Sequence, residues 1–326
     1  MTEPVRFRGP LVDTDPYDEF AFIAENAAEM GVEWPGALTH VRRDSRTLGS
    51  GQQLSLIRWG DGPAEIVFLH GGGQNAHTWD SVIVALGRPA IAIDLPGHGH
   101  SDRRSDGDHG PWQNALAVAE LLELDRAAVG VPPVAPVLVG MSLGGATTIR
   151  LAATRADLFR AAVVVDVTPQ VNDAGRAWTP EQRGSVALVG GPPTYESWDA
   201  IFDATMATSP KRTEAQIRRG VRHNAVRLED GRWAWRYELS GDPGTERTWV
   251  DFTPMWDDVA SITIPTMLVV GGDSVFVLPE DVDQFRRLLP SARVESVPGS
   301  GHAVQSDQPA ALVALLLEVL AAESRP

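Results

Sequence analysis

The sequence predicts an α/β protein in which helices cover both faces of a mainly parallel sheet. From about Thr39 onward, short runs rich in β-branched residues alternate with longer segments of helical periodicity, which is the pattern of successive strand–helix units. Several runs are apolar throughout, as expected of strands buried on both faces. The stretch 168–258 breaks this rhythm and is richer in Trp and Arg, so we expect it to form a cap inserted above one edge of the sheet.

The candidate strands can be read in order along the chain. Residues 42–48 and 53–59 are predicted to form a leading hairpin, because Gly49, Ser50 and Gly51 supply turn residues between them. The other candidates are short apolar runs that precede turns or Gly-rich segments. They are residues 66–69, 90–93, 136–139, 161–165, 266–270 and 293–297.

Helical periodicity appears in four places outside the strands. Residues 111–124 begin with Pro111, which suits a first helical turn. Residues 17–30 place Phe20, Ile23, Ala27 and Met30 on one face. Residues 213–222 predict a helix within the cap, and the apolar run 310–322 predicts a C-terminal helix too short to span a bilayer. The expected organisation is an N-terminal extension (1–38), a core (39–167 and 259–326) and a cap (168–258).

Composition narrows the classes of function. The 326 residues are 43% hydrophobic and 22% charged, which is ordinary for a globular protein, and the net charge is −15 with a pI near 4.9. This acidity disfavours binding to nucleic acid and to anionic membranes, since both rely on clustered Lys and Arg. No cysteine is present, which excludes disulfides, thiolate metal sites and a cysteine nucleophile. The first residues lack the apolar core of a signal peptide, so we expect a cytoplasmic protein without membrane insertion.

A serine lies between a predicted strand and a predicted helix. Gly140-Met141-Ser142-Leu143-Gly144 fits G-x-S-x-G, in which a strained turn lifts the serine hydroxyl above the sheet while the glycines allow close backbone approach. The apolar run 137–139 leads into this motif, and the helix-compatible run 146–153 follows it. An incidental serine in a Gly-rich turn would fit the pattern alone, but this context favours Ser142 as a nucleophile.

A glycine-rich loop follows the predicted strand 66–69. Flexible backbone at His70-Gly71-Gly72-Gly73 suits an oxyanion hole, in which N–H groups point at a developing negative charge. We expect Gly72 to supply one donor and Leu143, the residue after the nucleophile, to supply the other. A phosphate-binding loop is disfavoured, because no Lys-Ser/Thr pair follows and the G-x-G-x-x-G spacing is absent.

A histidine follows the last predicted strand. His302 lies just past residues 293–297 and before the C-terminal helix, where a loop at the active edge of the sheet can carry a base to the serine hydroxyl. A loop histidine is often structural or solvated, but this position favours His302 as the general base. His98, His100 and His109 share a polar loop, and a substrate contact by His98 or His100 is the less favoured interpretation.

These motifs together resemble the α/β-hydrolase superfamily in order and spacing, from about Thr39 to the C-terminus. They are residues 70–73, the segment Asp94-Leu95-Pro96-Gly97-His98-Gly99-His100-Ser101, residues 140–144 and Gly301-His302. The resemblance implies an eight-stranded sheet, a Ser-acid-His triad, no cofactor or metal, and a helical lid after the sixth strand.

The acid of the triad departs from the usual pattern of the family. Family members commonly place it after the seventh strand, three residues beyond a glycine, and here that register puts Ser274 behind Gly271. Asp273 is one residue early, while Asp281 and Asp283 fall in a predicted helix. Asp166 ends the sixth strand, a position from which some subfamilies, including certain esterases and dehalogenases, supply the acid. Asp166 is therefore the leading candidate, Asp273 the alternative, and a structural Asp166 that caps the entry to the lid stays open.

The expected function is hydrolysis of a carboxylic ester, thioester or lactone through an acyl-enzyme. The substrate is expected to be a small apolar ester. The serine at position 142 argues against dehalogenase and epoxide hydrolase activity, because enzymes with those activities resemble this pattern but carry aspartate at the same place. Carbon–carbon bond hydrolysis, perhydrolysis and a non-catalytic ligand-binding role remain alternatives, and homodimer formation is undecided. Aromatic and Met residues in or beside the cap are expected to form its core more often than to line a pocket: Trp178, Trp198, Met206, Trp233, Trp235 and Trp256.

Overall fold

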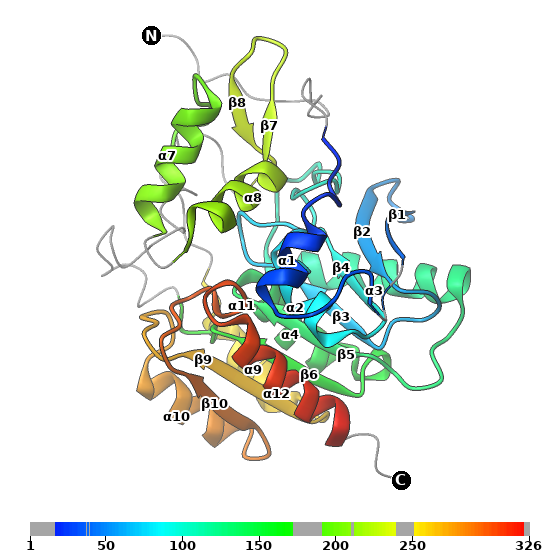
Figure 1. Ribbon diagram of the computed structural model, residues 1–326. Coiled ribbons are helices and arrows are strands. Elements are labelled where there is room, and N and C mark those ends of the chain that lie inside the picture. Colours follow the sequence, from blue (N-terminus) through cyan, green and yellow to red (C-terminus); the bar gives the residue numbers. More distant parts are fainter. Residues whose placement is uncertain are drawn as a thin grey trace.

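The computed structural model describes residues 17–36, 38, 40–171, 191–209, 212–238 and 251–322. Its centre is an eight-stranded sheet of order β1-β2-β4-β3-β5-β6-β9-β10 (Figure 1). The strands are β1 (Val41–Thr47), β2 (Gln53–Trp59), β3 (Ile66–Leu69), β4 (Ala90–Ile93), β5 (Val137–Met141), β6 (Ala161–Val165), β9 (Thr266–Gly271) and β10 (Arg293–Val297). The antiparallel β2 pairs with β1 and β4, and all other pairs are parallel. The predicted fold class and leading hairpin are therefore confirmed.

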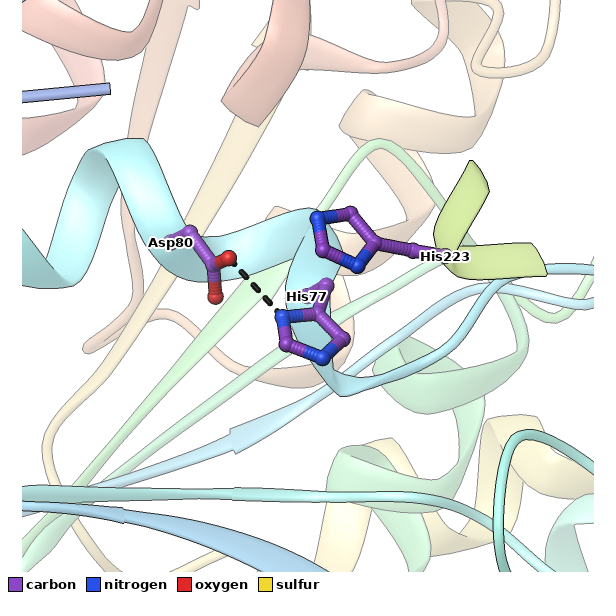
Figure 2. A group of neighbouring side chains, drawn as sticks. All are labelled: His77, Asp80 and His223. Atoms are coloured by element: carbon purple, nitrogen blue, oxygen red, sulfur yellow. Dashed lines mark hydrogen bonds and ion pairs between the residues drawn. The ribbon is translucent and has the colours of Figure 1, made fainter. Parts of the chain in front are cut away.

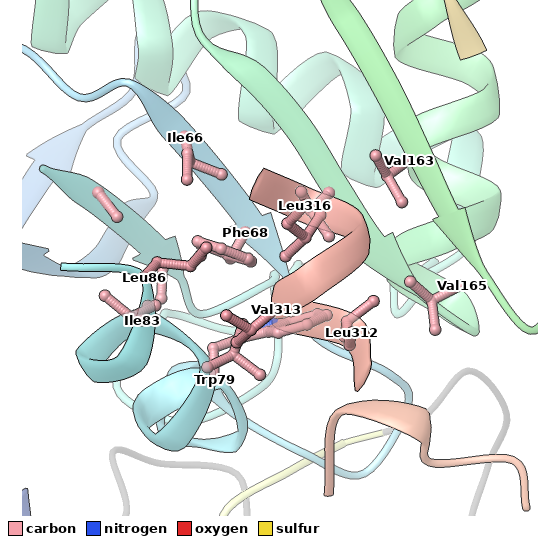
Figure 3. Close-up of a cluster of buried hydrophobic side chains, with 14 of the residues drawn as sticks. Ile66, Phe68, Trp79, Ile83, Leu86, Val163, Val165, Leu312, Val313 and Leu316 are labelled. Atoms are coloured by element: carbon pink, nitrogen blue, oxygen red, sulfur yellow. The ribbon is translucent and has the colours of Figure 1, made fainter. Parts of the chain in front are cut away.

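Helices cover the two faces of this sheet. One face carries α1 (Ile23–Glu29), α2 (Asp80–Leu86) and α12 (Pro309–Ala322), and the other carries α3 (Pro111–Val129), α4 (Leu143–Thr154), α9 (Trp256–Ser261) and α10 (Pro279–Leu288). The short helix α11 (Val304–Asp307) leads into α12. In β6, Val163 and Val165 pack under the first set of helices (Figure 3). Val164 packs under the second set. This alternation explains why the strand is apolar throughout.

The strand ends determine where the site residues emerge. β5 extends to Met141, two residues beyond the predicted end, so Ser142 follows the strand directly. β6 ends at Val165, immediately before Asp166. Because β5, β6 and β9 are neighbouring parallel strands, their C-terminal loops meet at one edge of the sheet. Such edges are where ligands bind in open α/β folds.

The N-terminal segment packs onto the sheet domain. The helix α1 is shorter than the predicted range 17–30, but the four predicted apolar residues do face the core: Ile23 and Ala27 are buried, and Phe20 and Met30 pack beside them. Before α1, Tyr17 lies within hydrogen-bond distance of His223, a residue of the cap, and Glu19 accepts hydrogen bonds from Arg43 of β1. The N-terminal segment therefore contacts both the sheet domain and the cap.

The described part of the cap lies above the sheet edge (Figure 1). It comprises α7 (Trp198–Thr208), α8 (Glu214–Asn224) and a small antiparallel hairpin of β7 (Ala225–Arg227) and β8 (Trp233–Trp235), which helical patterning did not predict. The predicted cap boundary after 258 falls inside α9, which packs against α4 and the sheet. In the described part of the chain, no helix is long and apolar enough to cross a membrane.

Candidate active site

Ser142 lies in a strained turn between β5 and α4. Its φ of 52° and ψ of −117° belong to a region that L-residues rarely adopt, and such strain is typical of functional turns. The flanking glycines are sterically required. A Cβ on Gly140 would lie 2.2 Å from the Gly144 carbonyl oxygen, and a Cβ on Gly144 would lie 2.4 Å from the Leu69 carbonyl oxygen.

The structure brings Ser142, His302 and Asp166 together. His302 Nε2 lies 3.0 Å from Ser142 Oγ, and His302 Nδ1 lies 2.8 Å from Asp166 Oδ2. Since an ionised carboxylate only accepts hydrogen bonds, Nδ1 carries the proton and Nε2 accepts from the serine. The Phe276 ring stacks on the imidazole, with centroids 3.6 Å apart and planes 12° apart. The arrangement gives the serine a base of fixed orientation.

Asp166 is held in place by the loop that follows β9. Its side chain is fully buried, and its φ of 51° places it in the left-handed region. Oδ1 accepts a hydrogen bond from the Gly271 amide at 2.9 Å, and Oδ2 also accepts one from the Ser274 hydroxyl. Ser274, three residues beyond Gly271, thus holds a hydroxyl where the resemblance to the family led us to look for an acid, and it donates to the Asp166 carboxylate.

Asp273, the alternative acid, lies in the exposed turn next to this loop. Its backbone amide donates to the Ser300 carbonyl at 2.8 Å, which ties the turn to the loop before His302. The His302 Nδ1 atom, which the acid of a triad has to contact, is already hydrogen-bonded to Asp166. Asp281 and Asp283 lie within α10, as the sequence predicted.

Two side chains of the sheet domain hold the glycine loop after β3. The Gly71 amide donates to Gln74 Oε1 at 3.1 Å, and the Gly73 amide donates to His98 Nε2 at 3.1 Å. His98 in turn donates from Nδ1 to the Pro96 carbonyl. Burial lowers the pKa of His98 to about 3, so it stays neutral and can accept from Gly73. Sequence reasoning left this supporting role unassigned.

The segment after β4 is held by a buried acid. Asp94 accepts from the Ala76 amide at 2.7 Å, from the His100 amide at 3.0 Å and from Arg43 Nη1 at 2.7 Å. Burial opposes the charged form of Asp94, but Arg43 outweighs it and holds the pKa of Asp94 well below its usual range. Arg43 also pairs with Glu19. This network connects β1, the loop after β4 and the N-terminal segment.

Ser142 and His302 open onto a cavity of about 260 Å³ between the sheet edge and the cap. Its walls combine apolar and polar side chains. Contributors are Asn26 and Met30 of the N-terminal segment, Gly71, Gly72 and Gly73 of the loop, and Thr205, Arg212, Ile217, Val221 and Trp235 of the cap. The lining is therefore more polar than the small apolar substrate expected from sequence would require.

The cap's aromatic residues mostly pack on one another. Trp198, Met206, Trp233 and Trp235 belong to a cluster around Ile201 and Ile217, while Trp256 packs under α4 in the sheet domain. Trp178 lies outside the described residues. Of these residues, Trp235 alone is also among the described residues that line the cavity.

Known proteins resemble the chain over most of its length. A model described as the alpha/beta hydrolase family matches residues 66–315. Esterase Rv0045c of Mycobacterium tuberculosis is 46% identical over 304 residues, which cover 93% of this chain and 96% of that protein. The sn-1-specific diacylglycerol lipase ABHD11 of Mus musculus is 30% identical over 248 residues, 75% of this chain and 76% of that protein.

A solved structure matches as well. It shows the same Mycobacterium tuberculosis esterase, in work on its inhibition by transition metals, and aligns at 45% identity with a TM-score of 0.79, covering 94% of this chain and 99% of that one. The family model spans more than half of the chain, and the sheet order and the serine turn agree with it. The chain therefore belongs to the alpha/beta hydrolase family.

Proposed function

We propose that the chain is a serine esterase that cleaves carboxylic esters, thioesters or lactones through an acyl-enzyme. One observation carries the proposal: the hydrogen-bond chain from Ser142 through His302 to the buried Asp166, which opens onto a cavity. The name of the similar Mycobacterium tuberculosis esterase supports the same reaction class.

In the proposed mechanism, His302 Nε2 removes the proton from Ser142 Oγ as this oxygen attacks the substrate carbonyl carbon. Asp166 holds the Nδ1 proton and stabilises the imidazolium that forms. The imidazolium then protonates the departing alcohol, thiol or ring oxygen, and the acyl group stays on Ser142. A water molecule, deprotonated by His302, attacks the acyl carbon, and its proton returns to Ser142 as the acid is released.

We propose that two backbone amides stabilise the negatively charged oxygen of the tetrahedral intermediate. In the loop after β3, the amides of Gly71 and Gly73 donate within the protein, so we assign the Gly72 amide, which also lines the cavity, as one of the two donors. Leu143 is the first residue of α4, where backbone amides have no partner inside the helix. Removal of one such donor typically costs about 3 kcal/mol of transition-state stabilisation.

We propose that residues 168–258 act as the lid of this site. The described cap residues supply one wall of the cavity, and Asn224 of α8 donates to the Gly73 carbonyl. This bond connects the cap to the glycine loop beside the nucleophile. The cavity volume of about 260 Å³ is near the lower end of ligand pockets, which start at roughly 300 Å³, and it favours small acyl or alcohol groups.

Ester hydrolysis by the Ser142→Ala variant tests the proposal. We expect turnover of a short-chain p-nitrophenyl ester to fall by about a million-fold, since the loss of a triad member typically has this effect, while the exposed turn variant Ser50→Ala keeps normal turnover. Near-normal turnover by purified Ser142→Ala would refute the assignment. A substrate panel then separates the reaction classes: esters, thioesters and lactones, diketones that are cleaved at a carbon–carbon bond, and a perhydrolysis assay. A protein that is inactive on all of these substrates would favour a ligand-binding role.

A further inference from the structure

Two buried histidines face each other where the cap meets the sheet domain (Figure 2). His77 comes from the 3-10 turn Ala76–Trp79, and His223 comes from α8 of the cap. Their rings stack with centroids 3.8 Å apart and planes 12° apart. Asp80, the first residue of α2, accepts a hydrogen bond from His77 Nδ1 at 2.9 Å. One ligand-type atom from each of the three residues lies within 4.8 Å of the others.

Two polar atoms of this cluster are buried without a hydrogen-bond partner among the described residues: His223 Nε2 and Asp80 Oδ1. Burial of polar atoms without partners is costly, and such atoms are uncommon in native proteins. The other nitrogen of His223, Nδ1, is 2.9 Å from the Tyr17 hydroxyl. When Nδ1 carries the proton and donates it to Tyr17, Nε2 presents a free lone pair toward its neighbours.

We infer that His77, Asp80 and His223 form a binding site for a divalent transition-metal ion, with Zn²⁺ as the best match. Two imidazoles and one carboxylate are typical ligands of zinc, and three protein ligands leave a coordination position open. Tyr17 beside His223 Nδ1 and Glu19 beside His77 Nε2 are placed to orient the two rings through their second nitrogens.

The two rings have to tilt for the metal to bind. Zinc bonds of about 2.0–2.2 Å keep ligand atoms at most roughly 4 Å apart, and the three ligand-type atoms lie within 4.8 Å of one another. Parallel rings also direct their lone pairs side by side and not at one point, so binding has to tilt the stacked imidazoles toward each other. Since His223 belongs to the cap and the other two ligands to the sheet domain, this movement links the two parts.

Inhibition by transition metals is named for the similar Mycobacterium tuberculosis esterase, and the cluster of His77, Asp80 and His223 gives such inhibition a location in this fold. His77 and His223 both line the cavity that contains Ser142 and His302. The neighbouring Asn224 donates to the Gly73 carbonyl of the glycine loop. A metal that tilts His223 would therefore narrow the cavity and shift the segment that supports this loop. This consequence rests on the proposed esterase function, but the metal site itself does not.

Charged groups surround the two rings. The cationic groups that act on them are Arg43, Arg219 and Arg236, and Arg43 and Arg219 are paired with acids. Asp80 and Glu19 lie directly beside the His77 nitrogens, at 2.9 and 3.0 Å. These two carboxylates offset the neighbouring guanidinium groups and favour a cation at the cluster.

Binding is best measured in the Ser142→Ala variant, so that the result does not depend on turnover. We expect calorimetry to show one Zn²⁺ per chain. In this background, His223→Gln and Asp80→Asn should each weaken binding at least tenfold, whereas His302→Gln and the exposed control His40→Gln should leave it unchanged. Absence of Zn²⁺ binding, or binding lost in His302→Gln and kept in His223→Gln, would overturn the inference. Melting curves in chelator establish that each variant is folded.

A second measurement needs no substitution in the cluster. Electron paramagnetic resonance of Cu²⁺ bound to the Ser142→Ala protein should show coupling to two imidazole nitrogens. Coupling to a single nitrogen would place the ion at His302 or another lone histidine and contradict the proposed ligand set. Inhibition of wild-type ester hydrolysis by Zn²⁺ should be relieved by chelator, and a protein that binds Zn²⁺ without inhibition would separate the metal site from its proposed effect on the esterase.

Discussion

At the scale of single residues, the acid of the proposed triad illustrates how position determines role. The loop after β9 supplies Ser274 and the Gly271 amide as donors to Asp166. Asp166 directly follows the neighbouring strand β6. Its φ of 51° is in the left-handed region, and its carboxylate is bonded to His302. The strand β6 thus leads into the carboxylate, and the loop after β9 supplies the groups that hold it.

We predict that Asp166→Asn lowers kcat far more than Asp273→Asn. The amide preserves shape but favours the wrong imidazole tautomer, a change that costs about 10⁴-fold in a serine protease, whereas the Asp273 side chain is exposed in a turn. Steady-state kinetics on one ester, with circular dichroism as a check of folding, measures both variants. A large loss in Asp273→Asn with an active Asp166→Asn would reverse the assignment of the acid.

At the scale of elements, the cap has a small core separate from its contacts with the cavity. Trp198 and Trp233 pack edge to face with centroids 5.1 Å apart, and the Arg222 guanidinium lies 5.9 Å from each ring centroid. Trp235 belongs to the same cluster and also lines the cavity. The sequence does not distinguish these tryptophans, because the residue type is the same at each position and only the folded packing differs.

We predict different outcomes for two tryptophan truncations. Trp198→Ala should lower the free energy of unfolding by about 2 kcal/mol, less than the 3–5 kcal/mol typical of fully buried aromatics, and reduce activity evenly across acyl lengths. Trp235→Ala should instead change the preference among acyl lengths, because it enlarges the cavity. Denaturant titration and a graded ester series measure both. Equal changes in acyl preference in the two variants would contradict the division between cap core and cavity wall.

At the scale of the whole molecule, buried charges connect the N-terminal segment to the sheet domain. Glu19 is bonded to Arg43 of β1 and to His77. Burial raises the pKa of Glu19, but His77 and Arg43 outweigh it and lower the value from 4.5 to about 2. Because the folded state binds the proton more weakly, the stabilisation is present above pH 4.5 and is lost as pH falls toward 2.

We predict that stability depends on pH through this cluster at both ends of the range. Wild type should lose stability between pH 4.5 and 2, with Glu19 contributing at most about 1.4 kcal/mol per pH unit, and Glu19→Gln should show a shallower loss. The pKa of His77 is raised to about 9, so its stabilisation is complete below 6.5 and is lost as pH rises through 9. Urea titrations at a series of pH values measure the free energy of unfolding. An equal loss of this free energy between pH 4.5 and 2 in wild type and in Glu19→Gln would contradict the prediction.

The sheet, the turn at Ser142 and the position of His302 after the last strand could be predicted from the sequence, because each depends on a local pattern of residues. Apolar runs mark buried strands, and G-x-S-x-G needs glycines whose added Cβ atoms would collide with backbone. The supports of the site could not be predicted in the same way. His98 under Gly73, Ser274 beside Asp166 and Tyr17 beside His223 are contacts between residues far apart in the sequence, and they depend on how loops pack. The placement of the chain in the cytoplasm stays a prediction.

The central claim is that Ser142 is a nucleophile activated by His302 and Asp166. Covalent labelling with a fluorophosphonate, followed by intact mass and peptide mapping, tests it most directly, because the reagent reacts with an activated serine and no substrate has to be known. The account predicts one adduct, on the Ser142 peptide, with no adduct in Ser142→Ala and slow labelling in Asp166→Asn. An unlabelled wild-type protein, or equal labelling of wild type and Ser142→Ala, would contradict it.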